Sequence, residues 1–214
     1  CAQGWISPRA MRNGIIVTVL FACLIGSALL FYAGWELIIV GLLCVLFAFL
    51  YTTGPYPLSY NGWGDVLVIV FFGFVPVGGT YYVQALTWTS DTTVASLICG
   101  LLIDTLLVVN NYRDREADAR SGKRTVIVRF GEKFGRYLYL MLGVAASLLC
   151  FWFFFEGHLF AALLPLLYLI PHVLTWRRMV QIHSGKKLNS ILGETSRNML
   201  LMGILLSIGF LIRH

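Results

Sequence analysis

Seven long, nearly uninterrupted apolar stretches constrain this chain more than any other feature. Each approaches the ~20 residues that a helix needs to cross the apolar core of a bilayer. Their approximate ranges are 13–33, 36–53, 65–86, 92–112, 136–155, 158–176 and 196–212. Membrane-spanning strands would instead alternate apolar and polar residues over ~10-residue segments. The pattern predicts an all-α, multi-pass transmembrane helix bundle, in agreement with a composition that is 58% hydrophobic and only 12% charged.

Two of these stretches contain residues that disturb a regular helix. The third includes Gly73, Pro76 and two further glycines, so we expect a kink or break near its middle. The sixth contains Pro165 and Pro171, which should disturb it in the same way. Such irregular turns persist in membranes where neighbouring helices satisfy the freed backbone groups.

The basic residues are distributed very unevenly among the connecting segments. If the seven helices alternate in direction, fifteen of the sixteen Lys and Arg residues lie on one face of the membrane, and only Arg213 lies on the other. An excess of Lys and Arg marks the cytoplasmic side. The distribution predicts a protein of the cell inner membrane whose polar mass and activity face the cytoplasm, unlike a receptor or adhesion protein.

The segment VVNNYRDREADARSGKR, residues 108–124, is the most densely charged part of the chain. Nothing breaks a helix there before Gly122, so Asn110, Asp114 and Asp118 share one face within an arc of about 80°, while Glu116 points away. Two carboxylates one turn apart repel each other unless a positive charge lies between them. Their hard oxygen atoms suit Mg²⁺, which usually completes its shell with water and substrate phosphates.

A simpler interpretation of the same segment is that its charges only orient the protein in the membrane. The Asp pair, however, lies at the mouth of a membrane helix and is followed by a cluster of Lys and Arg residues. An apolar bundle that ends in a metal–phosphate site suits a substrate with a diphosphate head and a long hydrocarbon tail.

Two segments of the chain resemble a known family. NNYRDREADARSGKRTVIVRFG (110–131) closely resembles the second acidic motif of the UbiA-type intramembrane prenyltransferases. YTTGPYPLSYNGWGDVLVIVFFG (51–73) resembles the cytoplasmic loop of the branch that prenylates 1,4-dihydroxy-2-naphthoate in menaquinone biosynthesis. The resemblance extends over essentially the whole chain.

The resemblance implies a bundle of about nine membrane helices, each of roughly 20 residues, around a cavity open to lipid. It also implies a first acidic motif, which with about two helices would precede Cys1. Residues 1–214 are thus expected to form a single prenyltransferase domain that lacks those parts. The expected reaction is Mg²⁺-dependent transfer of a polyprenyl group from its diphosphate to 1,4-dihydroxy-2-naphthoate, releasing CO₂ and diphosphate. The expected partners are these two substrates and the lipid bilayer, with no nucleic acid.

The same resemblance implies roles for individual residues. Asp114 and Asp118 are the expected Mg²⁺ ligands, and Asn110 should support them or touch the diphosphate. Four cations are expected to bind phosphate oxygens, the first of which could instead pair with the aspartates: Arg113, Lys123, Arg124 and Arg129.

The loop at 51–65 is expected to close over the site and bind the aromatic acceptor through Tyr51, Tyr56, Tyr60, Asn61 and Asp65. The tyrosines could instead form an interfacial aromatic belt, and Asp65 could simply stabilise a helix N-terminus.

Asp104 lies within one of the predicted membrane helices, and two roles are considered for it. An acidic residue inside a membrane helix suggests function, but Asp104 lies on the face of Asn111 rather than Asp114, which favours a paired or protonated structural role.

Three rival functions remain. The aromatic acceptor could instead be 4-hydroxybenzoate, homogentisate or a porphyrin. A transporter should show paired broken helices in two related halves, and only one break is evident. A purely structural membrane subunit would leave the alignment of residues 110–118 unexplained.

Overall fold

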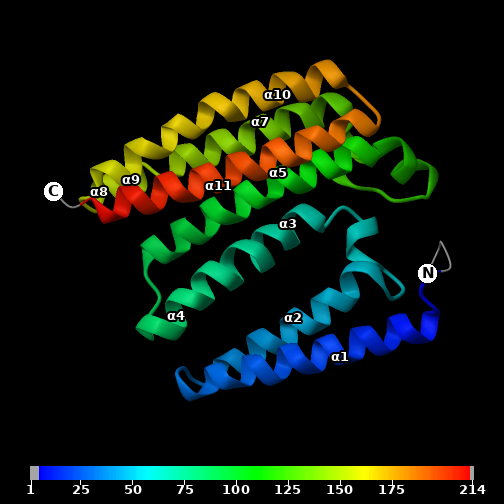
Figure 1. Cartoon of the computed structure of the whole chain (residues 1–214), viewed down its shortest axis with the longest axis horizontal. Coiled ribbons are helices and arrows are strands. Elements are labelled where there is room, and N and C mark those ends of the chain that lie inside the picture. The colour runs from blue at the N-terminus through cyan, green and yellow to red at the C-terminus, as the bar shows by residue number, and fades with distance from the viewer. Residues whose placement is uncertain (1–4, 213–214) are drawn as a thin grey trace.

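The computed structural model describes residues 5–212, and within that range it consists of helices and short connections without a strand (Figure 1). Seven helical segments run back and forth. The first four are α1 (Pro8–Ser27) with η1 (Ala28–Phe31), α2 (Glu36–Thr52), the run α3 (Gly64–Val68), η3 (Ile69–Gly78) and α4 (Gly79–Ala85), and α5 (Ser90–Arg120). The last three are α7 (Glu132–Leu149) with α8 (Trp152–Phe155), the run α9 (Leu159–Leu163), η4 (Leu164–Tyr168) and α10 (Leu169–Ile182), and α11 (Asn189–Leu211). Three short helices lie in the connections: η2 (Leu58–Tyr60), α6 (Val126–Phe130) and η5 (Lys186–Leu188).

All seven predicted membrane segments form helices. Six of them are long and apolar enough to cross a bilayer, and the remaining one, α2, is an apolar helix of 17 residues. Many large apolar side chains point outward from these helices, as a lipid environment allows. The prediction of a multi-pass membrane helix bundle is therefore confirmed.

The irregular third segment is a change of helix type rather than a break in the chain. Residues Ile69–Gly78 form a π-helix that contains Pro76 and continues into α3 and α4. A Cβ atom added at Gly73 would lie 2.5 Å from the carbonyl oxygen of Ser96, and one at Gly100 would lie 2.9 Å from the Cα of Ile69. Both glycines are therefore required for η3 to lie directly against α5.

The sixth segment is disturbed at only one of its two prolines. Pro165 lies in η4, a 3-10 turn between α9 and α10. Pro171 lies in the first turn of α10, which continues to Ile182 without interruption. A proline is tolerated at that position because the first backbone N–H groups of a helix have no partner within the helix.

The packed core lies among α5, α7, α10 and α11. One cluster of buried side chains includes Val109, Tyr112, Ile127, Tyr139 and Met179, and a second includes Ile98, Ala146, Phe153, Tyr168 and Met202. Helices α1 and α2 bury none of their side chains and lie as a hairpin beside α3 and η3 (Figure 1). A ring contact of 5.2 Å between Phe47 and Phe71 joins α2 to η3.

The connections that carry the basic residues meet at one end of the bundle. In Figure 1 the connections after α2, α5 and α10 lie at the same end as the start of α1. This arrangement is the alternation that the distribution of Lys and Arg predicts. Arg213, the one basic residue expected at the opposite end, lies outside the described residues.

Candidate functional site

The charged segment forms the last turns of α5. Thr89 caps the start of this helix by accepting a hydrogen bond from the Thr92 N–H, and the helix then runs without interruption to Arg120. The expected helical spacing of Asn110, Asp114 and Asp118 is therefore present, and they lie on one face. Glu116 is exposed, and no cation forms an ion pair with it among the described residues.

Arg113 holds the first two members of this face together. Its guanidinium donates to the Asn110 Oδ1 at 2.7 Å and to the Asp114 Oδ1 at 2.7 Å. A third hydrogen bond of 3.0 Å reaches the Oδ1 of Asn189, the first residue of α11. Of the two roles considered for Arg113, the structure therefore shows the ion pair with an aspartate, and it also shows that this pair joins α5 to α11.

Lys123 belongs to the turn that follows α5. The backbone turns sharply at Gly122, whose φ of 78° favours glycine, and the Lys123 N–H donates to the Asp118 carbonyl at 2.9 Å. The Lys123 Nζ lies 3.4 Å from the Asp118 Oδ2. Each aspartate thus has a cation beside it, and Asp118 is the more buried of the two, with 13% of its side chain exposed against 39% for Asp114.

The predicted acceptor loop lies against the predicted phosphate-binding segment. The Arg124 N–H donates to the Tyr60 carbonyl at 2.7 Å, and the Arg129 guanidinium donates to the Asn61 carbonyl at 2.7 Å. The Asn61 side chain in turn donates to the Pro57 carbonyl at 2.8 Å, which stiffens the loop. Two segments more than sixty residues apart in the chain therefore meet at the end of α5.

A small polar pocket lies between this loop and α5. Of the predicted residues it brings together Tyr51, Asp65 and Lys123. Tyr56 and Tyr60 do not line it and are 56% and 43% exposed.

The pocket also contains polar residues that the sequence did not single out. They are Ser59, Asn111 and Thr125. Asn111 directly follows the predicted Asn110, and its direction on the helix differs by only about 20° from that of Asp118, a signal that could have identified it. No sequence pattern marks Ser59 or Thr125 as a site residue, because both reach the pocket only when the loop docks against the segment that follows α5.

Asp104 of α5 is a further acidic group near Asp65, which lines this pocket. Asp104 is 1% exposed, and its Oδ1 has no hydrogen-bond partner, as is also true of the Asp65 Oδ1. The two carboxyl groups are near enough to interact electrostatically. Asp104 therefore lies closer to the pocket face of α5 than to the face of Asp114.

The donor groups at the end of α5 suit a divalent cation only in part. No group of three or more His, Cys, Asp and Glu side chains that could hold a metal occurs within residues 5–212. Two carboxylates and an amide from one helix form an incomplete shell of oxygen ligands. Such a partial set fits a hard divalent cation that is completed by other ligands, as Mg²⁺ commonly is by substrate phosphates.

Comparison with known proteins gives one family and a consistent group of relatives. A family model described as the UbiA prenyltransferase family matches residues 1–208. The chain is 36% identical to a 1,4-dihydroxy-2-naphthoate octaprenyltransferase of Haemophilus influenzae, over 98% of this chain and 70% of that protein. Proteins of the same name from Escherichia coli and Mycobacterium leprae are 38% and 39% identical over 69% and 66% of this chain. The aligned region covers 50% and 48% of those two proteins, so the chain spans about half of their length.

Proposed function

The chain belongs to the UbiA prenyltransferase family, and from that membership we propose that its protein transfers a polyprenyl group from polyprenyl diphosphate to 1,4-dihydroxy-2-naphthoate. The product would be demethylmenaquinol, with loss of CO₂ and diphosphate. The names of the relatives support this choice of substrates. The observation that carries the proposal is the docking of residues 57–62 onto residues 123–129 at the end of α5, which brings the two expected substrate-binding segments together.

Asp114 and Asp118 would hold Mg²⁺, and Asn110 would support them. When bound, Mg²⁺ supplies positive charge that stabilises the diphosphate as it leaves. Arg113 and Lys123, which pair with these aspartates, would turn toward phosphate oxygens and add further charge-assisted hydrogen bonds. The exposed side chain of Arg124 would serve the same task. Arg129 would serve it indirectly, because it holds the loop at the Asn61 carbonyl.

The bonds change as in an electrophilic aromatic substitution. The allylic C–O bond breaks, and its electron pair leaves with the diphosphate. The electron-rich ring then forms a bond to the allylic carbon at the position that carries the carboxylate. The C–C bond to that carboxylate breaks, its electrons restore the aromatic ring, and CO₂ leaves. The apolar walls of the bundle keep water away from the cationic carbon.

Residues of the 51–65 segment would bind the aromatic acceptor. Tyr51 and Asp65 line the small pocket and could contact the hydroxyl groups of the naphthoate. Tyr56, Tyr60 and Asn61 would act through the position of the loop, because the Tyr60 and Asn61 carbonyls bind the 124–129 segment. The basic end of the bundle would face the cytoplasm from the cell inner membrane.

The choice of acceptor can be tested with the full-length protein in lipid nanodiscs. Mg²⁺ and a polyprenyl diphosphate are supplied with 1,4-dihydroxy-2-naphthoate, 4-hydroxybenzoate or homogentisate in separate reactions, and products are identified by mass spectrometry. We expect a prenylated product from the naphthoate alone, with one CO₂ released for each product. Prenylation of another acceptor, or no product from the naphthoate, would contradict the proposal. The Asp114→Ala variant provides the background.

A further inference from the structure

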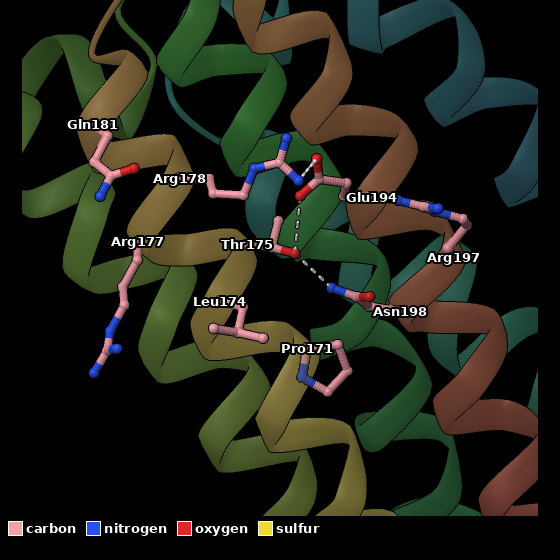
Figure 2. A pocket seen from close by; sticks show the side chains of 9 residues that line it. All are labelled: Pro171, Leu174, Thr175, Arg177, Arg178, Gln181, Glu194, Arg197 and Asn198. Atoms are coloured by element: carbon pink, nitrogen blue, oxygen red, sulfur yellow. Dashed lines mark hydrogen bonds and ion pairs between the residues drawn. The ribbon is translucent and has the colours of Figure 1, made fainter.

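A second pocket, here named the α10–α11 pocket, lies between those two helices (Figure 2) and shares no lining residue with the small pocket beside α5. Its volume is about 430 Å³. The floor consists of Thr175, Glu194 and Asn198, all buried. The Asn198 amide donates to the Thr175 hydroxyl at 3.0 Å, and that hydroxyl donates to the Glu194 Oε2 at 3.4 Å. The floor is therefore a fixed polar surface.

Three arginines surround this floor. Arg178 forms an ion pair of 2.6 Å with the Glu194 Oε1, so one positive charge is neutralised. Arg177 on α10 and Arg197 on α11 are exposed and extend to opposite sides of the pocket (Figure 2). No described carboxylate forms an ion pair with either of them. The α10–α11 pocket thus has two positive charges in excess.

An apolar surface continues from this pocket along both helices, away from the basic end. On α10, Leu174 and Ile170 are 53% and 63% exposed. On α11, Leu201 and Ile204 are 37% and 47% exposed, and they follow Arg197 at helical spacings that keep them on the same side. The surface therefore changes from cationic to apolar along the direction of the membrane helices.

We propose that the α10–α11 pocket binds the headgroup of an anionic phospholipid. The lipid headgroup would occupy the pocket, and Arg177 and Arg197 would turn inward from its two sides toward the phosphate oxygens, which suit guanidinium groups. The acyl chains would lie along the apolar surface. Basic pockets between membrane helices on the cytoplasmic side bind anionic headgroups in this way. The only carboxylate that lines the pocket, Glu194, is paired with Arg178, so the site suits a phosphodiester without a metal better than a metal-bound diphosphate.

Lipid retention by the full-length protein tests this site. The protein is purified in mild detergent and exposed to equal amounts of phosphatidylglycerol and phosphatidylcholine of matched acyl chains, and bound lipid is counted by native mass spectrometry. We expect preferential retention of phosphatidylglycerol. In the variant Arg177→Gln/Arg197→Gln that preference should fall by roughly five-fold for each charge, or about 25-fold in all. Glu194 and Arg178 are left intact, so no buried charge loses its partner.

The matched control is Arg9→Gln/Arg12→Gln, which removes two exposed cations of α1 that lie outside the pocket. It should retain the wild-type preference. Equal retention of the two lipids by the wild-type protein would overturn the proposal. An equal loss in both double variants would also overturn it, because lipid binding would then follow net charge alone. An unchanged preference for phosphatidylglycerol in the Arg177→Gln/Arg197→Gln variant would overturn the proposal as well. That result is expected if another part of the protein covers this surface.

Discussion

At the scale of single residues, the site depends on a cation that comes from the same helix as its carboxylates. The helical spacing correctly places Asn110 and Asp114 on one face, and it predicts that a positive charge must separate the aspartates. It does not predict that Arg113, whose Cα is offset by about 100° from that face, bends back to bind both. The reach of a long side chain is set by its rotamers and by Asn189 of α11, and neither can be read from spacing.

A substitution that keeps the positive charge of Arg113 but removes its guanidinium group should lower activity. Arg113→Lys leaves a compact ammonium group that cannot bind Asn110, Asp114 and Asn189 together. We expect kcat/KM for the polyprenyl diphosphate to fall about ten-fold, the effect of losing one or two charge-assisted hydrogen bonds. The control is Arg120→Lys, since Arg120 is exposed at the end of α5 and should tolerate the change. Equal kinetics for the two variants would show that only the charge of Arg113 matters.

At the scale of elements, the contact between η3 and α5 determines where the loop and the acidic motif meet. Gly73 lies against the Ser96 carbonyl and against Gly100, so the two backbones touch without an intervening side chain. The chain that leaves α2 can then bring the segment 57–62 alongside the end of α5.

This contact gives a test of stability with a built-in control. Gly73→Ala places a methyl group within 2.5 Å of a backbone oxygen, and we expect it to lower the free energy of unfolding by about 1–3 kcal/mol. Gly79→Ala, six residues along the same run, meets no atom within 4 Å and should leave stability unchanged or raise it by up to about 1 kcal/mol. Unfolding in mixed detergent and SDS, followed by circular dichroism, measures both. Equal free energies of unfolding for the two variants would mean that η3 and α5 can move apart at little cost in free energy.

The sequence predicts these elements better than it predicts their contacts. Gly73 and Pro76 correctly mark an irregular third segment, but Gly100 lies in a continuous apolar run that gives no hint of its partner. The loop is fixed through the carbonyl oxygens of Tyr60 and Asn61, and every residue has such an oxygen. The residues of the small pocket that were missed, Ser59 and Thr125, follow from this backbone docking and could not be found from side-chain types.

At the scale of the whole molecule, the candidate site and the basic connecting segments lie at the same end of the bundle. The basic residues from which the orientation is predicted also include the cations beside Asp114 and Asp118. The interior is packed among α5, α7, α10 and α11, while the outward faces are apolar. Under the proposed function, this arrangement would let the polyprenyl chain remain in lipid while its diphosphate reaches the polar end. It could be predicted from the sequence because apolar length and charge asymmetry are properties of the chain itself.

The proposed function requires the face of Asn110, Asp114 and Asp118 to bind a Mg²⁺–diphosphate group. The most direct measurement compares Mg²⁺-dependent prenyl transfer to 1,4-dihydroxy-2-naphthoate by the full-length protein and by two variants that each remove one negative charge from α5. Asp118→Asn should reduce the rate at least about 100-fold, because it removes a group that holds charge at the leaving diphosphate. Glu116→Gln, at an exposed position two residues away, should retain the wild-type rate. Equal losses in the two variants, or a wild-type rate in Asp118→Asn, would contradict the account.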